Sequence, residues 1–280
     1  MDLHTLNWME DVINRLDIPL DSLPSIKPSM FNYGTNEGIL KNVPITAVLG
    51  DQQASLFGQN CIASGDVKNT YGTGCFALTN TGSEIVHSNN GLLSTVAYQK
   101  DGDKPQYAIE GSVSIAGAAV QWLRDNLNII KESSDVEALA MAEKDNGDVY
   151  FVPAFSGLFS PHWDETARGV LVGLSRFSNK SHIARAVLES VAYQSNELLE
   201  SMEKDIGITF ESVNVDGGMV VNNLLMQFQS DIFNKKVISQ EINEITALGA
   251  GAASFLFINN LPLENMNSFI TQSKLSLIHI

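Results

Sequence analysis

The hydrophobic positions of the first 60 residues predict one short helix and one strand. Apolar side chains recur at helical spacing over residues 8–16 and stop before Pro19, which indicates a short amphipathic helix. Residues 43–49 form a largely apolar run of the kind found in buried strands. That strand would deliver Asp51 at its carboxyl end.

From Gly65 onward, apolar and polar residues alternate around glycine-rich turns. "GDVKNTYGTGCFALTNTG" predicts two short strands joined at Gly72-Thr73-Gly74. Residues 92–99 and 106–111 predict a second hairpin across "DGDK". We therefore expect this region to be rich in β-structure.

Helices and strands alternate in the rest of the chain. The pattern is helical in "SIAGAAVQWLRDNLNII" and in "SSDVEALAMAEK", where Ser134 and Glu137 have the spacing of a capping box. The strand "VYFVP" precedes the longest helix signal, residues 181–205, for which Ser181 is the expected N-cap. Strand, glycine turn and helix follow in "SVNVDGGMVVNNLLMQFQSDIF", and "EITALGAGAASFLFIN" predicts a last helix. This order predicts an α/β fold, a mixed sheet with helices packed on its faces.

Composition and charge narrow the classes of partner. The 280 residues are 44% hydrophobic, and 32 acidic against 17 basic residues give a net charge of −15. The charges form no basic stripe, so we expect no nucleic-acid partner. No apolar run approaches the roughly 20 residues of a membrane span, and the first residues lack a signal-peptide pattern. We therefore expect a cytoplasmic protein with no membrane partner. Cys61 and Cys75 lack metal-binding spacing and are expected in the core.

Three segments that follow predicted strands are candidates for chemistry: Asp51-Gln52, Gly72-Thr73-Gly74 and Asp216-Gly217-Gly218. Ligands of open α/β sheets bind beyond the carboxyl ends of strands, and glycine lets a backbone approach a phosphate closely. Each segment also has a structural interpretation. Asp51 would be a helix cap, and the glycine segments would be a hairpin turn and a strand-to-helix turn. The residues alone leave both interpretations open.

Phosphoryl transfer is one reaction that these segments could serve. An aspartate without a charge partner can accept the proton of a bound hydroxyl, and phosphoryl transfer needs such a carboxylate with Mg²⁺ and phosphate-binding amides. The chain has no P-loop and no Gly-x-Gly-x-x-Gly motif, so a kinase here requires another architecture. His162 and Asp164, in "SGLFSPHWD", are interpreted as residues that hold a loop.

Taken together, several segments resemble the FGGY family of carbohydrate kinases, in particular the branch that phosphorylates glycerol. They are "GDQQASLFGQ", "NTYGTGCFALTNTG", "AGAAVQWLRD", "YFVPAFSGLFSPHWD", "GVLVGLSRFSNKSHIARAVLE", "DGGMVVNNLLMQFQSDI" and "TALGAGAA". The resemblance implies an actin-like ATPase architecture, in which two RNase H-like domains close on ATP and a polyol. It also implies an ATP- and Mg²⁺-dependent transferase and leaves a homo-oligomer open.

The resemblance assigns expected roles to ten residues. Asp51 is similar to the family's general base and would lie near Mg²⁺, through water. Gln52 and Phe76 match positions that contact glycerol. The expected ATP-binding residues are Thr73, Gly74, Gly117, Gln121, Gly217, Gly218 and Asn222.

The resemblance also predicts how the chain is divided. Residues 1–60 resemble the end of the family's first domain, and residues 61–273 its second, nucleotide-binding domain. Residues 274–280, "KLSLIHI", resemble a non-native tail. The family's first half, with further glycerol and phosphate contacts, has no counterpart here, so we expect this piece to be weakly active or inactive. The segment "TNEGILKNVP" lacks the Gly-Gly-Thr-Arg loop of fructose 1,6-bisphosphate regulation.

Three functions follow as hypotheses. The first is ATP-dependent phosphorylation of glycerol to sn-glycerol 3-phosphate, with Asp51 as the general base. The second is a nucleotide-binding or assembly module without catalysis. The third is a kinase for another polyol or a ketose.

Overall fold

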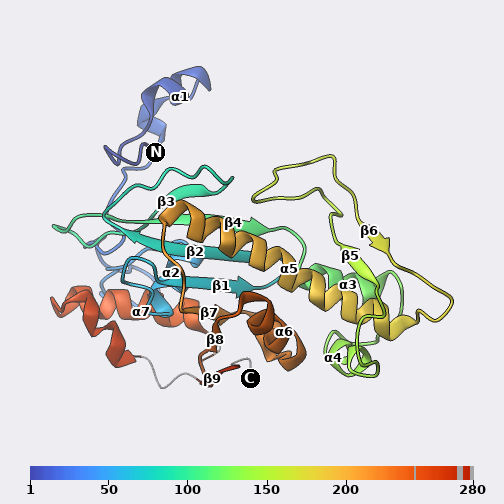
Figure 1. Cartoon of the computed structure of the whole chain (residues 1–280). Coiled ribbons are helices and arrows are strands. Elements are labelled where there is room, and N and C mark those ends of the chain that lie inside the picture. Colours follow the sequence, from blue (N-terminus) through green and yellow to red (C-terminus); the bar gives the residue numbers. More distant parts are fainter. Residues whose placement is uncertain (243, 270–273, 278–280) are drawn as a thin grey trace.

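The computed structural model describes residues 1–242, 244–269 and 274–277 and is built on a mixed sheet (Figure 1). Among these residues seven strands form one sheet. In spatial order they are β3 (Leu93–Tyr98), β4 (Gln106–Val113), β2 (Cys75–Gly82), β1 (Val67–Tyr71), β7 (Ser212–Asp216), β8 (Lys236–Ser239) and β9 (Lys274–Leu277). β1 is antiparallel to β2 and parallel to β7. The α/β fold class and both hairpins predicted from the sequence are confirmed.

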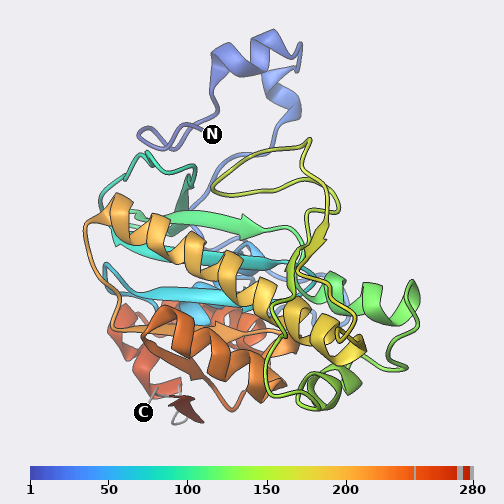
Figure 2. The same ribbon diagram turned by 45° about the vertical axis from the view of Figure 1, so that its right-hand side comes forward.

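Helices cover both faces of this sheet. On one face lie α3 (Gly117–Asp125), α4 (Asp135–Ala140), α5 (Lys180–Ile206) and α6 (Asn223–Phe233), and on the other α2 (Asp51–Gly58) and α7 (Ile245–Ile258). The remaining elements are α1 (Glu10–Arg15), the 3-10 helices η1 (Leu20–Ser22), η2 (Gly218–Val221) and η3 (Leu263–Phe269), and a small sheet of β5 (Tyr150–Val152) and β6 (Val170–Val172). Figures 1 and 2 show α5 lying across the sheet and α1 standing apart from it.

The central strands contribute side chains to two separate hydrophobic cores, because successive side chains of a strand point to opposite faces of the sheet. Ala77 and Ile109 enter the core with α5 and α6. Their neighbours Leu78 and Ala108 enter the core with α2 and α7. Lys68 follows Val67, a member of the first core, so its side chain points to the face that α2 covers.

Residues 43–49 do not form the predicted buried strand. Two isolated bridges, at Pro44 and Ala47, and several backbone hydrogen bonds join this run to residues 29–36, and Val48 is 55% exposed. These bonds satisfy backbone groups of the run without forming a continuous ladder, so hydrophobic character alone does not make it a regular strand. Asp51 therefore follows an irregular segment and not a strand.

The predicted N-cap of α5 and the predicted capping box of α4 are also wrong. The N-cap of α5 is Asn179, whose Oδ1 accepts the backbone N–H of Ser181 at 2.8 Å. Ser134 is the N-cap residue of α4 but makes no side-chain cap hydrogen bond. Glu137 instead accepts the backbone N–H of Leu224 at 2.9 Å. At α5 the side chain of Asn179 takes the role assigned to Ser181, whereas at α4 no side chain caps the helix.

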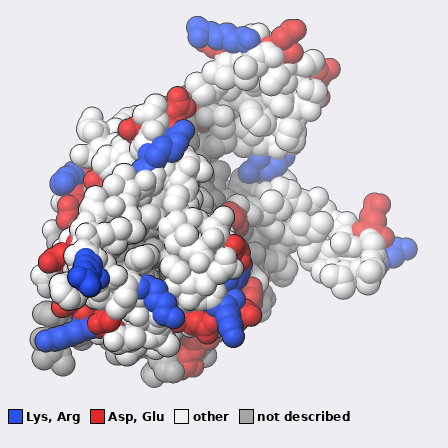
Figure 3. All heavy atoms as spheres, turned by 90° about the vertical axis from the view of Figure 1, so that its right-hand side faces the viewer, with Lys and Arg blue, Asp and Glu red and all other residues white. Residues whose placement is uncertain are grey.

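The predicted division at residue 60 stays a prediction. α2, which precedes that boundary, packs against α7 and the sheet. Of the predicted tail, Lys274–Leu277 form β9 and pair with β8, and residues 278–280 lie outside the described residues. On the face shown in Figure 3, basic and acidic side chains are interspersed. None of the described helices is long and apolar enough to cross a membrane.

The contact between α2 and α7 predicts that alanine substitutions at two glycines of α7 change the stability of the fold in opposite directions. A Cβ added at Gly249 would lie 1.9 Å from the carbonyl oxygen of Ala54, whereas one at Gly251 on the same helix would meet open space. We expect Gly249→Ala to lower the free energy of unfolding by about 1–3 kcal/mol through overpacking. Gly251→Ala is the control and should raise it by roughly 0.5–1 kcal/mol through helix propensity. Urea unfolding measures both, and equal effects would contradict the packing described.

Candidate functional site

The turn Gly72-Thr73-Gly74 joins β1 to β2 and supports the start of α3. The backbone N–H groups of Ala116 and Ala118 donate to the Thr73 carbonyl at 2.9 and 3.1 Å, and that of Gly117 donates to the Gly72 carbonyl at 3.0 Å. A Cβ at Gly117 would lie 2.6 Å from this carbonyl oxygen. The close approach therefore requires glycine at 117.

The Asp216-Gly217-Gly218 segment turns the chain from β7 into η2. Gly217 has φ = +95°, and a Cβ there would lie 2.4 Å from the carbonyl oxygen of Tyr71. Gly218 faces open space. Asn222 then caps α6 by accepting the backbone N–H of Leu225 at 2.8 Å. The segment is thus a strand-to-helix turn, and the turn borders a cavity.

This cavity has a volume of about 550 Å³ and brings together five of the seven residues expected to bind ATP. They are Thr73, Gly117, Gln121, Gly218 and Asn222. The other two adjoin it in sequence: Gly74 packs against the carbonyl of Val113, and Gly217 packs against Tyr71. Residues from three separate segments of the chain therefore converge on one cavity.

The cavity wall is largely apolar and carries no Lys or Arg side chain among its described residues. Val120, Val136, Leu188 and Met219 supply apolar surface. Glu137 is the one charged lining residue, and Leu224 occupies one of its oxygens. Such a wall suits a flat uncharged group better than it suits a polyanion.

The three residues expected at the polyol lie on α2 and β2. Asp51 is exposed and begins α2, and its Oδ1 accepts the backbone N–H of Gln52 at 2.8 Å. The N-cap is Gly50, so Asp51 stands inside the first turn and is not the cap. Phe76 is half-buried in β2, opposite Thr70 of β1.

A buried lysine joins these residues. Lys68 is fully buried, and its Nζ donates to Gln52 Oε1, to Thr70 Oγ1 at 2.8 Å and to the Phe76 carbonyl at 3.3 Å. Ser55 extends the network: its Oγ lies 3.4 Å from Thr70 Oγ1. Polar contacts thus run from α2 into the centre of the sheet.

The same network reaches the glycine turn after β7. Ser55 Oγ donates to Asp216 Oδ2 at 2.7 Å, and Asp216 Oδ1 is buried with no hydrogen-bond partner. The start of α2 and the turn beside the cavity are therefore connected through buried polar groups. Such networks are strengthened by the low dielectric of the interior.

Burial shifts the pKa values of this region strongly. It lowers the pKa of Lys68 to about 8, an effect that Asp216, Cys61, Glu110 and Asp51 partly oppose. Burial raises the pKa of Glu110. It also raises the pKa of the Cys61 thiol, which is a free core cysteine, as Cys75 is. The expectation that both cysteines are core residues is confirmed.

The sequence interpretation missed Lys68, Ser55 and Thr70. The one sequence signal for Lys68 was its place in the predicted strand, because strand alternation assigns its side chain to one face of β1. Using it required knowing that α2 covers that face, and this is tertiary information. The spacing of "VKNTY" does not contain it.

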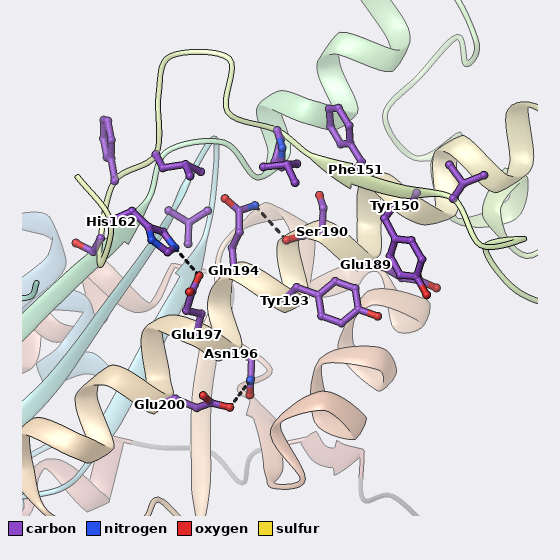
Figure 4. Close-up of a pocket in the computed structure, with 18 residues that line it drawn as sticks. Tyr150, Phe151, His162, Glu189, Ser190, Tyr193, Gln194, Asn196, Glu197 and Glu200 are labelled. Carbon is purple, nitrogen blue, oxygen red and sulfur yellow. Dashed lines mark hydrogen bonds and ion pairs between the residues drawn. The ribbon is translucent and has the colours of Figure 1, made fainter. Parts of the chain in front are cut away.

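A second cavity, of about 570 Å³, lies between β5 and α5 and contains none of the predicted site residues (Figure 4). His162 points from the loop toward Glu197 of α5, with Nε2 and Oε2 3.0 Å apart. Asp164 accepts the backbone N–H of Thr166 at 2.8 Å. This pair holds the loop, as expected from the sequence.

Comparison with known proteins identifies the family of the chain. Residues 67–255 match the family sequence model for the C-terminal domain of the FGGY family of carbohydrate kinases. Glycerol kinase of Brucella anthropi is 58% identical over 259 residues, and that of Methylobacterium radiotolerans is 55% identical over 258 residues. Each match covers 92% of this chain and 52% of the relative. The chain therefore spans about half the length of these curated relatives.

Solved structures show the same fold. Plasmodium falciparum glycerol kinase with ADP superposes with a TM-score of 0.89 at 37% identity, covering 100% of this chain and 57% of that one. Xylulose kinase from Lactobacillus acidophilus superposes with a TM-score of 0.87 at 22% identity. This match covers 99% of this chain and 57% of the xylulose kinase chain. The fold is thus that of an actin-like ATPase domain. The chain belongs to the FGGY family of carbohydrate kinases.

The buried ammonium makes stability depend on pH. Lys68 has a pKa of about 8 in the folded chain, below its ordinary value of 10.5. Below pH 8 Lys68 is charged in both the folded and the unfolded chain, so the free energy of folding includes the full cost of burying the charge. Between about pH 8 and 10.5 the unfolded state binds more protons, so this penalty falls as pH rises.

We predict that the natural chain gains up to about 3 kcal/mol relative to Lys68→Met over that range, since one pKa unit corresponds to about 1.4 kcal/mol. Urea unfolding of both proteins at several pH values measures the difference. Comparing the two cancels the opposite contribution of the buried tyrosines and cysteines, whose raised pKa values lower stability at high pH. A difference that does not change with pH would contradict the prediction.

Proposed function

We propose that this chain supplies the nucleotide-binding part and the general base of an ATP-dependent glycerol kinase, which forms sn-glycerol 3-phosphate. The observation that carries the proposal is the convergence of Thr73, Gly117, Gln121, Gly218 and Asn222 on one cavity. The curated relatives are glycerol kinases, and the similar Plasmodium falciparum structure contains ADP. ATP and glycerol as substrates favour a cytoplasmic location.

The cavity is assigned to the adenosine part of the nucleotide. Its apolar wall offers contact surface for a base, and Gln121 and Asn222 offer polar groups at its edge. The phosphates would extend past Gly218 toward Thr73, which is exposed at the hairpin turn. With no Lys or Arg on the described wall, backbone amides and a metal ion must offset the phosphate charge.

Asp51 is assigned the role of general base. Its carboxylate is exposed at the start of α2, and the Gln52 N–H holds one of its oxygens in place. Accepting the proton of the terminal glycerol hydroxyl as the γ-phosphoryl group arrives would raise the nucleophilicity of that oxygen. Gln52 and Phe76 would orient the polyol.

The described residues also fit Mg²⁺ as the metal. They contain no group of three or more His, Cys, Asp or Glu side chains that could hold an ion without other ligands. Mg²⁺ keeps several waters and takes one or two carboxylates plus substrate phosphates, so Asp51, through water, suits it. When bound, the ion neutralises charge on the phosphate oxygens.

Replacing the general base tests the catalytic assignment. The protein used is a chimaera that joins this chain to the remainder of the Brucella anthropi relative, because the chain by itself is expected to turn over glycerol negligibly. We expect Asp51→Asn to lower kcat about 10²- to 10⁴-fold, with ADP affinity unchanged.

Asp21→Asn, at an exposed carboxylate in η1, is the matched control and should leave kcat unaltered. A coupled assay of glycerol 3-phosphate formation measures both variants. Full activity of Asp51→Asn, or a clear preference of the chimaera for a ketose, would contradict the proposal.

Closing the cavity tests the nucleotide assignment in this chain itself. We expect Gly117→Val to lower ADP affinity at least tenfold, because its side chain would collide with the Gly72 carbonyl and move α3. Gly251→Ala, far from the cavity, should bind ADP as the natural chain does. Calorimetric titration with ADP and Mg²⁺ gives the affinities. Equal affinity in Gly117→Val would exclude this cavity as the site.

A further inference from the structure

Lys68 is placed where lysine is rarely found. It lies in β1, the central strand between β2 and β7, and its side chain is fully buried beneath α2. Lysine is almost never buried completely unless its charge is compensated. The general base and nucleotide cavity proposed above do not account for it.

Every proton of the Lys68 ammonium group has an acceptor. Gln52 Oε1, Thr70 Oγ1 and the Phe76 carbonyl take the three N–H bonds that the group can donate. The acceptors belong to α2, β1 and β2, so the ammonium joins three elements. Two of them carry residues expected to contact the polyol.

The bond to Lys68 determines which way the Gln52 carboxamide faces. An ammonium group can only donate, so it must meet the oxygen of the amide, and a flipped amide would set N–H against N–H. With its oxygen facing the lysine, Gln52 can present only its two N–H donors elsewhere. A substrate hydroxyl oxygen is the acceptor that such donors suit.

Charged groups from three elements surround the ammonium. Asp51 lies on α2, Glu110 on β4 and Asp216 on β7, and each favours the charged lysine. An uncharged side chain at 68 would leave these carboxylates without a buried counter-charge.

We propose that Lys68 is a positioning residue for phosphoryl transfer: it fixes the Gln52 carboxamide with its oxygen inward and its N–H donors toward the polyol. The proposal deepens, and rests on, the function proposed above. It makes the recognition of the acceptor hydroxyl depend on a side chain that does not touch the substrate.

The orientation is tested first in this chain, without reference to activity. Burial lowers the pKa of Lys68 to about 8. The Gln52 side-chain amide signals in nitrogen-proton NMR spectra, assigned by their loss in Gln52→Ala, should therefore shift with a midpoint near pH 8. In Lys68→Met they should lose this shift and exchange faster with water. Lys104→Met, in an exposed turn, is the control. Amide signals that are identical in Lys68→Met would overturn the proposal.

Kinetics in the chimaera then test the consequence. We expect Lys68→Met to raise KM for glycerol about tenfold and to leave KM for ATP within about twofold. In a Gln52→Ala background the same change should have no further effect on KM for glycerol, because the lysine acts through that amide. An effect of Lys68→Met that persists undiminished in Gln52→Ala would overturn the proposal.

Gln52→Glu separates positioning from folding. A carboxylate keeps the acceptor for Lys68 but removes both N–H donors, so this variant should fold normally and still raise KM for glycerol about tenfold. Unchanged KM would count against the orientation. If the chimaera phosphorylated no glycerol at all, the proposed function would fail, and the NMR titration would still decide whether Lys68 orients Gln52.

Discussion

The parallel pairing of β1 with β7 is the constraint on which the candidate site depends. Thr70 lies opposite Asp216, so both strands end at the same level of the sheet. Each then continues into a glycine turn, and Gly217 packs directly on the backbone of Tyr71. A slip of one residue would send each side chain of a strand to the opposite face and would separate these turns. The cavity exists because the register brings two distant segments together.

The two faces of the sheet then serve different purposes. One face supports α3, α4 and α5, whose packing around the glycine turns forms the wall of the cavity. The other face holds α2, and with it Asp51 and Gln52, against β1 and β2. The contacts of Lys68, Thr70 and Ser55 connect α2 to the end of β7. Groups assigned to the polyol and to the nucleotide are thus fixed to one rigid sheet, which limits the geometric error of a transfer reaction.

Much of the fold was predictable because its signals are local. Alternation around glycine turns correctly gave both hairpins, and helical periodicity gave α5 and α7. Residues 43–49 show the limit of this reasoning, since a strand needs a regular ladder with its neighbour and an apolar run does not reveal whether one forms. The caps failed for a related reason: Asn179 and Ser181 both stand near the start of α5, and backbone geometry selects between them.

The candidate site was predictable only in part. The residues alone marked the glycine turns and Asp51, and family resemblance added Gly117, Gln121 and Asn222. Neither source indicated Lys68, because its importance comes from the helix that covers it and from acceptors on three elements. Buried polar networks of this kind are properties of the tertiary structure.

The site proposed for the nucleotide lies where the glycine turns, α3 and the start of α6 meet. Backbone NMR of this chain titrated with ADP and Mg²⁺ tests it most directly. We expect the largest shift changes at Thr73, Gly117, Gln121, Gly218 and Asn222, and unchanged signals around the cavity between β5 and α5. Shift changes concentrated around Tyr150, His162 and Tyr193, or none at millimolar ADP, would contradict it.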